Sequence, residues 1–202
     1  MRGVPRVSEA HLAARREQIL DAARRRFLHN GFHSTSMQDV IAEAGLSTGA
    51  VYRYFRSKNE IIAAIAGSYA TGLREVIGDL AADPELGLGE VMERVVEVVD
   101  ENTGPDGVLR LAVQVWAEAL RDPAVAAVAE QIYVTMRGNF VELAQRAVEA
   151  GELPADADPK AVGATLFSLV LGYALQRMLT GQPDLDTYRA GLRSLLTACR
   201  IR

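Results

Sequence analysis

The sequence predicts an all-α protein of about nine helices, divided into a small N-terminal domain of three helices and a larger C-terminal helical domain. Apolar residues recur at the i, i+3, i+4, i+7 spacing of a helix through nearly the whole chain of 202 residues. Glycine ends several of these segments, and an Asp-Pro pair begins two others, at Asp122-Pro123 and Asp158-Pro159. The composition, 49% hydrophobic and 24% charged, suits a globular protein with a sizeable core.

The first predicted helix runs from about Glu9 to Asn30. Its buried stripe consists of apolar residues at helical spacing: Ile19, Ala22, Ala23 and Phe27. Gly31 is expected to end this helix in a left-handed conformation, and Phe32 to fill the core of the three-helix domain. His29 and His33 lie four residues apart, but the helix ends between them, so we predict no metal site.

The stretch from Met37 to Lys58 predicts two short helices joined by a tight turn. Residues Met37 to Ala44 carry apolar side chains at the spacing of one buried helical face. Gly45 can adopt the positive φ of a helix C-terminus, and Ser47 can cap the N-terminus of the next helix. The second helix is therefore predicted from Thr48 to about Phe55.

The two sides of this second helix differ in character. At about 100° per residue, one side gathers residues that can pack on the preceding helix: Ala50, Val51, Tyr54 and Phe55. The other side gathers hydroxyl groups, arginines and a glycine: Thr48, Gly49, Tyr52, Arg53 and Arg56. This second side suits DNA, because N–H groups at a helix N-terminus attract phosphate and arginine donates to guanine edges. A generic helical hairpin with a solvated face has the same spacing, so spacing alone leaves both interpretations open.

A longer series of residues, in order and without a gap, surrounds this stretch. It consists of Arg16, Ile19, Leu20, Ala22, Ala23, Phe27, Gly31, Phe32, Thr35, Ser36, Met37, Val40, Ile41, Ala42, Ala44, Gly45, Leu46, Ser47, Gly49, Tyr52, Tyr54, Phe55, Ser57, Lys58, Glu60 and Ile61. The series resembles the N-terminal domain of the tetracycline-repressor (TetR) family. It covers about the first third of the chain, and the remainder is similar to the family in length and helical character.

The resemblance implies a helix-turn-helix DNA-binding domain at residues 1–58, with the motif at about 36–55, and an effector-binding and dimerisation domain at residues 59–202. It implies a sequence-specific transcriptional regulator, a dimeric repressor that a small-molecule effector releases from a palindromic operator. An activator, or an effector-free DNA-binding protein of the same fold, is the alternative. The predicted DNA-binding residues are Thr35, Ser36, Gln38, Ser47, Thr48, Gly49, Tyr52, Arg53, Tyr54 and Lys58.

Charge is distributed unevenly along the chain. Residues 1–60 carry 10 Lys+Arg against 6 Asp+Glu, a net charge of +4, whereas the remaining residues carry 12 against 20, a net charge of −8. A basic N-terminal third on an acidic body is expected of a DNA-reading end attached to a separate module. Arg2 and Arg6 precede the first helix, where a basic arm can enter the minor groove or form a tail without a role.

Other features exclude competing classes. The single cysteine, Cys199, rules out an intrachain disulfide and favours a reducing, cytoplasmic location, with the thiol itself expected to be inert. No secretory signal is evident, and the uncharged run from Ala161 to Gln176 is shorter than a membrane span. No catalytic motif appears, and every histidine lies in the first 33 residues. We therefore predict no catalytic residue, cofactor or metal.

The C-terminal domain is predicted to consist of further helices. They run at about 58–80, 90–101, 108–121, 123–150, 159–180 and 185–200, with a linker at 81–89. The helix at 159–180 is apolar on nearly all sides, and the single helix after it is too little to cover it. A partner subunit is expected to cover the rest, with full burial inside the monomer as the alternative. The predicted dimer interface is Gly163, Phe167, Val170, Leu171, Leu192, Leu195 and Leu196.

An effector pocket is expected between the helices of this domain. Its candidates are adaptable apolar or aromatic side chains with a few polar groups: Tyr69, Met92, Trp116, Tyr133, Met136, Arg137, Phe140 and Phe167. No charged cluster indicates a highly charged effector, so a largely apolar molecule is expected, with Arg137 available for a carboxylate. Ordinary core packing is the alternative role for each of these side chains.

Overall fold

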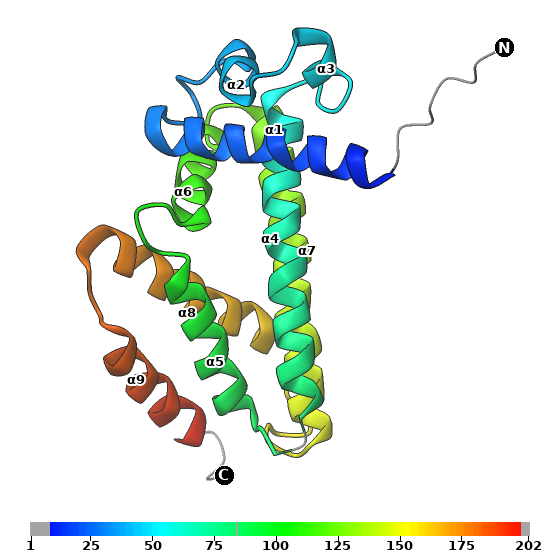
Figure 1. The fold of residues 1–202 in the computed structure, drawn as a ribbon. Coiled ribbons are helices and arrows are strands. Elements are labelled where there is room, and N and C mark those ends of the chain that lie inside the picture. The colour runs from blue at the N-terminus through cyan, green and yellow to red at the C-terminus, as the bar shows by residue number, and fades with distance from the viewer. Residues whose placement is uncertain (1–8, 84, 199–202) are drawn as a thin grey trace, which may run out of the picture. The chain divides into compact units, whose positions relative to one another are not determined.

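The computed structural model describes residues 9–83 and 85–198, and the regular structure in these segments is entirely helical (Figure 1). The helices are α1 (Glu9–Asn30), α2 (Met37–Ala44), α3 (Thr48–Tyr52), α4 (Lys58–Ala82), α5 (Leu88–Glu101), α6 (Val108–Ala119), α7 (Pro123–Glu149), α8 (Pro159–Thr180) and α9 (Leu185–Ala198). The all-α prediction is confirmed. The expectations for Arg2, Arg6 and Cys199 fall outside the described residues.

The second helix of the predicted helix-turn-helix is shorter than expected. α3 ends at Tyr52 and not near Phe55. The N–H groups of Tyr54 and Phe55 both donate to the carbonyl oxygen of Val51, at 2.9 and 3.0 Å, which closes the chain into a tight turn. This turn places Phe55 in the core at 4% exposure.

The chain forms two compact units. The first comprises the described residues up to Ala66 together with Leu111–Val128, and the second comprises Gly67–Arg110 with the described residues from Ala129 onward. The boundaries between the units fall inside α4, inside α6 and inside α7. These units are defined by which residues pack together. The predicted boundary after residue 58 was instead drawn between an expected DNA-binding domain and an expected effector-binding domain.

The core of the first unit is formed where α1 packs against α2. Its fully buried side chains include Ile19, Leu20, Phe27, Val40, Val51 and Ile61. The rings of Phe27 and Phe32 meet edge to face, with centroids 5.2 Å apart. Gly31, at φ 86°, has the left-handed conformation predicted for the end of α1, and it turns the chain so that Phe32 packs back onto this core.

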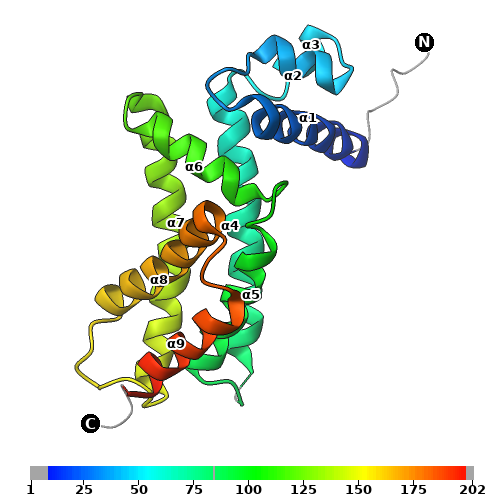
Figure 2. The ribbon, with the colours of Figure 1, turned by 90° about the vertical axis from the view of Figure 1, so that its left-hand side faces the viewer.

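In the second unit, α5 contacts both α8 and α9 (Figure 2). The core between these helices, α4 and α7 includes Leu73, Met92, Val95, Phe140, Leu143, Leu166, Phe167, Val170, Tyr173 and Leu192. The fully buried Tyr173 on α8 donates its hydroxyl hydrogen to Asp100 Oδ1 on α5 at 2.5 Å. Arg177 Nε donates to the same oxygen at 3.1 Å, so the carboxylate of Asp100 joins the two helices.

Glu93 joins α5 to α9. Its side chain is 7% exposed, and Arg193 donates to both of its oxygens, from Nε at 2.8 Å and from Nη2 at 2.7 Å. Arg189 Nε adds a third contact at 3.2 Å and also pairs through Nη1 with Glu97. The hydrogen bond from Arg193, helped by that from Arg189, holds the pKa of Glu93 below its ordinary value.

The long apolar helix α8 is only partly buried in the chain. It is the one helix among the described residues that is long and apolar enough to cross a membrane by length and composition, with 33% of its most apolar window buried. Gly163 lies where α8 crosses α7, because a Cβ there would stand 2.7 Å from the Val141 backbone. Exposed side chains remain on its outer face, among them Thr165, Ser168, Leu175 and Leu179.

Candidate nucleic-acid interface and ligand core

The helix-turn-helix is built by local caps. Gly45 follows α2 with φ 64°, and its N–H donates to the carbonyl oxygen of Ala42 at 3.2 Å. The Ser47 hydroxyl then accepts from the N–H of Ala50 at 3.3 Å, which caps α3. Val51 is fully buried and fixes α3 on the core of the first unit. The turn and the start of the second helix therefore lie where the sequence predicts them.

The predicted DNA-facing side of α3 is exposed. Thr48, Gly49, Tyr52 and Arg53 all lie on the surface, with Tyr52 at 41% exposure. Apart from its chain neighbours and the backbone of its own helix, no described atom comes within 4 Å of a Cβ placed on Gly49, so this surface of α3 is open to a partner. An aromatic phenol, a guanidinium group and free backbone N–H groups thus share one accessible surface.

The predicted DNA-binding residues near the start of α2 differ in exposure. Gln38 and Ser36 are exposed, and Ser36 forms a capping box in which its backbone N–H donates to Asp39 Oδ2 at 2.7 Å. Thr35 is different, because it is 1% exposed and its hydroxyl donates to the carbonyl oxygen of Gly31 at 2.8 Å. Thr35 therefore holds the α1–α2 turn and has no exposed surface for DNA, so it does not belong to the interface.

Lys58 has partners inside the first unit. Its Nζ donates to the carbonyl oxygens of Phe32 at 2.9 Å and of His33 at 3.2 Å, and it lies 4.8 Å from the centroid of the Phe32 ring. Burial lowers the pKa of Lys58, opposed by the nearby carboxylates of Glu118 and Asp39. Lys58 therefore ties the start of α4 to the α1–α2 turn, whatever contact it makes with phosphate.

A groove of about 310 Å³ runs between α1 and α3, and the sequence analysis missed the α1 residues that line it: His11, Leu12 and Arg15. His11 and Arg15 on α1 line this groove together with Arg53 and Tyr54. Their spacing was a usable signal, since His11, Arg15 and Gln18 share one helical face. Gln18 Nε2 donates to the carbonyl oxygen of Ala44 at 2.8 Å, so this face of α1 lies toward α2.

Most of the predicted effector-pocket residues lie together in the second unit. Tyr69, Met92, Tyr133, Met136, Phe140 and Phe167 all belong to its core or pack against it. The Phe167 ring meets Tyr133 and Phe140, each with centroids 5.5 Å apart. Trp116 belongs to the first unit, and Arg137 is exposed on α7. The rings of Tyr133, Phe140 and Phe167 thus form one cluster, and neither Trp116 nor the predicted carboxylate partner Arg137 belongs to it.

Two buried polar atoms of the second unit have no hydrogen-bond partner among the described residues: Tyr69 Oη and Asn139 Nδ2. Burial raises the pKa of the Tyr69 phenol to about 12, so the group is neutral at physiological pH. Asn139, at 4% exposure, was not among the predicted pocket residues. A single asparagine in an apolar stripe gives no signal in sequence, because its hydrogen bonding depends on distant elements.

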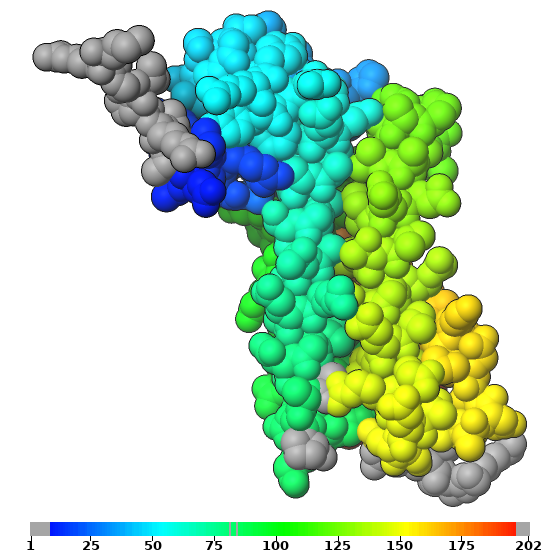
Figure 3. Space-filling model, turned by 90° about the vertical axis from the view of Figure 1, so that its right-hand side faces the viewer, coloured from blue at the N-terminus to red at the C-terminus, as the bar shows by residue number. Residues whose placement is uncertain are grey.

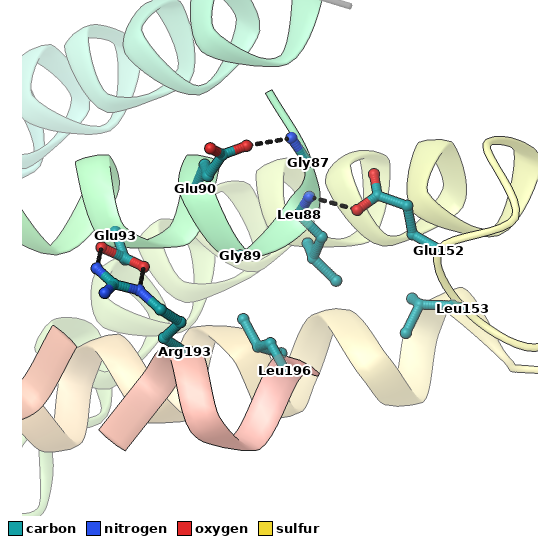
Figure 4. A pocket seen from close by; sticks show the side chains of 9 residues that line it. All are labelled: Gly87, Leu88, Gly89, Glu90, Glu93, Glu152, Leu153, Arg193 and Leu196. Carbon is teal, nitrogen blue, oxygen red and sulfur yellow. Dashed lines mark hydrogen bonds and ion pairs between the residues drawn. The ribbon is translucent and has the colours of Figure 1, made fainter. Parts of the chain in front are cut away.

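A separate hollow of about 280 Å³ in the second unit contains none of the predicted effector-pocket residues (Figure 4). Its polar groups already have partners: Glu90 accepts from the N–H of Gly87 at 3.0 Å, and Glu152 accepts from the N–H of Leu88 at 2.8 Å. These two contacts cap α5 two residues earlier than predicted. The polar side chains of the hollow are therefore already used, either to cap the start of α5 or in the Glu93–Arg193 ion pair.

The predicted dimer-interface residues fall into two groups. Gly163, Phe167, Val170 and Leu192 are buried within the chain itself. Leu171 and Leu196 are half-buried, and Leu195 is 60% exposed. On α8, Leu175 at 37% exposure and Leu179 at 69% exposure are further exposed apolar side chains that the prediction did not include. Among the described residues, no group of metal-ligating side chains gathers.

Comparison with known proteins agrees with this architecture. Residues 19–65 match the family described as bacterial regulatory proteins, tetR family, and residues 91–200 match the C-terminal domain of BetI-type transcriptional repressors. The HTH-type transcriptional regulator UidR of Escherichia coli strain K12 is 28% identical over 183 residues, which cover 90% of each chain.

Solved structures are similar along the whole chain. Salmonella enterica GusR superposes with a TM-score of 0.80 at 26% identity, covering 96% of this chain and 97% of that one. A regulator from Saccharomonospora viridis, solved in complex with choline, has a TM-score of 0.69 at 21% identity and covers 92% of this chain and 96% of its own. The second similarity concerns the fold alone.

Proposed function

Since this chain belongs to the tetR family of bacterial regulatory proteins, and is a DNA-binding transcriptional regulator and not an enzyme, we propose that it is a dimeric repressor released from its operator by a small molecule. The observation that carries the proposal is the exposed surface of α3, where Thr48, Gly49, Tyr52 and Arg53 lie beside an open helix N-terminus. Its place of action is the cytoplasm, where the DNA is.

In this proposal α3 enters the major groove. Arg53 donates to base edges, while Thr48 and the N–H groups around Gly49 contact phosphate. Ser36, Gln38 and Ser47 lie exposed around the same motif and add contacts to the DNA backbone. Arg15, on the other wall of the groove beside Arg53, is a further candidate for phosphate.

The dimer is proposed to form through the outer surfaces of α8 and α9. Leu175, Leu179 and Leu195 are large apolar side chains left exposed there, and the half-buried Leu171 and Leu196 extend the surface. Burying them against a second copy removes apolar area from water. Twofold symmetry then presents two α3 helices to half-sites separated by whole helical turns, about 34 to 36 Å or a multiple.

The effector is proposed to bind within the second unit, at the aromatic cluster of Tyr133, Phe140 and Phe167. The choline complex of the Saccharomonospora viridis regulator supports a small organic molecule as the class of ligand. The effector releases DNA only to the extent that it binds the DNA-free arrangement more tightly, typically by about 1 to 3 kcal/mol.

Selection of bound sequences from random DNA tests the proposal. The expected result is a palindrome, recovered at low salt, whose half-sites lie on one face of the duplex. The matched control is the same chain with Thr48, Tyr52 and Arg53 all replaced by alanine, which keeps the buried Val51. Recovery of no preferred sequence by the unmodified protein, or the same preference by the control, contradicts the proposal.

A further inference from the structure

Asn139 stands out in the second unit as a buried amide without a partner. It is 4% exposed, and its Nδ2 makes no hydrogen bond with any described residue. Burying an amide donor without a partner costs free energy, and buried polar groups in native proteins are nearly always paired. Such a group persists when something outside the chain supplies the partner or when it serves function.

The position of Asn139 connects it to the predicted effector site. On α7 it lies one turn from Met136 and Leu143, which both pack in the core of the second unit, and it directly precedes Phe140. Glu142, one turn further on, pairs with Arg74 of α4 at 3.5 Å, so this side of α7 runs along α4 (Figure 3). Asn139 therefore lies on the part of α7 that carries Phe140 of the aromatic cluster and runs along α4.

A second unpaired polar atom lies on α4. Tyr69 packs against the same core, and its Oη also lacks a hydrogen-bond partner among the described residues. The two atoms differ in chemistry, since the amide nitrogen can only donate, whereas the phenol can donate or accept. A bound molecule that satisfies Asn139 must therefore present an acceptor.

The charge around this region limits the ligand further. Within the described part of the second unit, Glu93 is the one buried charged side chain, and it is already paired with Arg189 and Arg193 toward α9. A fully buried ion beside Asn139 would lose its hydration, and the nearby Arg74 and Glu142, whose side chains are 63% and 66% exposed, are not buried with it to compensate. A neutral molecule avoids this cost, and the rings of Phe140 and Phe167 can contact its apolar part.

We infer that Asn139 is the hydrogen-bond donor of the effector site and that the effector is an uncharged molecule carrying an oxygen acceptor next to an apolar ring or chain. The inference rests on the proposal that the second unit binds an effector. It goes further by naming a residue that binds the effector and by specifying that the effector is uncharged. Asn139 Nδ2 donates to the oxygen of the ligand, and Tyr69 Oη provides a second polar contact.

The first test measures stability without any ligand. Asn139→Leu removes an unpaired buried amide and keeps the number and branching of the side-chain heavy atoms, so the thermal midpoint should stay the same or rise. Asn102→Leu is the matched control, because Asn102 Nδ2 donates to the carbonyl oxygen of Val98 at 2.8 Å, and its loss should lower the midpoint. A midpoint for Asn139→Leu that falls as far as that of the control shows that the amide is paired within the protein, and overturns the inference.

The second test compares three probes with one benzene ring and different head groups: acetophenone, benzoate and phenyltrimethylammonium. Acetophenone should raise the midpoint of the unmodified protein, and neither ion should do so to the same extent. Asn139→Leu should weaken acetophenone binding by about tenfold, the usual effect of losing one hydrogen bond. A larger effect of either ion overturns the charge class, and so does no effect of acetophenone up to its solubility limit. An equal shift in the variant means that the Asn139 amide does not bind the probe, and overturns the role of Asn139.

Operator binding separates failure of this inference from failure of the proposed function. If acetophenone binds through Asn139 but the protein stays bound to the selected operator, Asn139 is part of a ligand site, and the proposal that a ligand at this site releases the operator is wrong. If the protein selects an operator but acetophenone does not bind, the proposed DNA-binding function is supported and the inference about Asn139 is wrong.

Discussion

The backbone N–H of Phe32 donates to Gln114 Oε1 at 2.6 Å, joining residues 82 positions apart within the first unit. Gln114 lies on α6, and Phe32 lies in the turn that leads to the DNA-binding motif. On the next turn of α6, Glu118 Oε1 lies 3.3 Å from His33 Nδ1. Two consecutive turns of α6 therefore hold the α1–α2 turn in place.

Substitution of Gln114 should destabilise the first unit. Phe32 is 3% exposed, so Gln114→Leu leaves its N–H buried without a partner, at a cost of about 1 to 3 kcal/mol. Urea denaturation measures the change, with Gln131→Leu on the exposed side of α7 as the control. Equal stability of the two variants would mean that water replaces the side-chain oxygen.

Substitution of Arg53 should relax base preference. Arg53 is exposed at the end of α3, and Arg53→Ala should cost about 1 to 3 kcal/mol at one position of each half-site, with the other positions unchanged. Competition binding with operators changed at single positions measures this. Arg94→Ala, which removes an arginine from α5, should leave the whole pattern as it was. If Arg53→Ala also leaves the base preference unchanged, Arg53 does not contact base edges.

Substitution of Lys58 should show whether it contacts phosphate. If it does, Lys58→Met weakens binding to all sequences and makes the slope of log affinity against log salt shallower by about one unit. Its hydrogen bonds to the carbonyl oxygens of Phe32 and His33 predict a loss of stability as well. Weaker binding with an unchanged slope would assign Lys58 to positioning the turn alone.

The contact between α5 and α9 should depend on pH. Glu93→Gln removes the charge that Arg193 and Arg189 meet, and should cost about 1.5 to 3 kcal/mol at neutral pH. Because the folded-state pKa of Glu93 lies below its ordinary value of 4.5, this contribution is fully present above that value. It should be lost as the pH falls through the folded-state pKa.

Denaturation at a series of pH values follows this difference. Glu101→Gln, at an exposed position on the same helix, is the control and should change stability little. A difference between Glu93→Gln and the unmodified protein that persists unchanged to about pH 2, below the range where carboxylates normally ionise, would exclude the ionised carboxylate as its source.

Charged substitutions on α8 and α9 should prevent dimerisation. Leu179 and Leu195 are 69% and 60% exposed, so the double change Leu179→Glu, Leu195→Glu should leave the monomer folded while placing charges in the proposed interface. Sedimentation velocity measures the mass. Leu120→Glu, at an 88% exposed position in the first unit, should remain dimeric. A dimer of unchanged affinity in the double variant would place the interface elsewhere.

The sequence by itself determined the helices and the motif. Gly45 and Ser47 set the turn between α2 and α3, and Asp158 before Pro159 set the start of α8, because caps act on backbone groups a few residues away. The exposed side of α3 was predictable too, since its apolar and polar residues separate at helical spacing. Local interactions of this kind are contained in any short window of sequence.

The tertiary structure decided which helix covers which surface. Gly163 was predicted at a subunit interface, but it lies against Val141 of the same chain. Thr35 was predicted on DNA, but it is buried and its hydroxyl holds the α1–α2 turn. Lys58 holds the same turn through its ammonium group, a role that the sequence did not indicate. Asn139 was not noticed at all. Each of these outcomes depends on atoms brought together from distant parts of the chain, and periodicity along one helix says which residues face inward but not what they meet there.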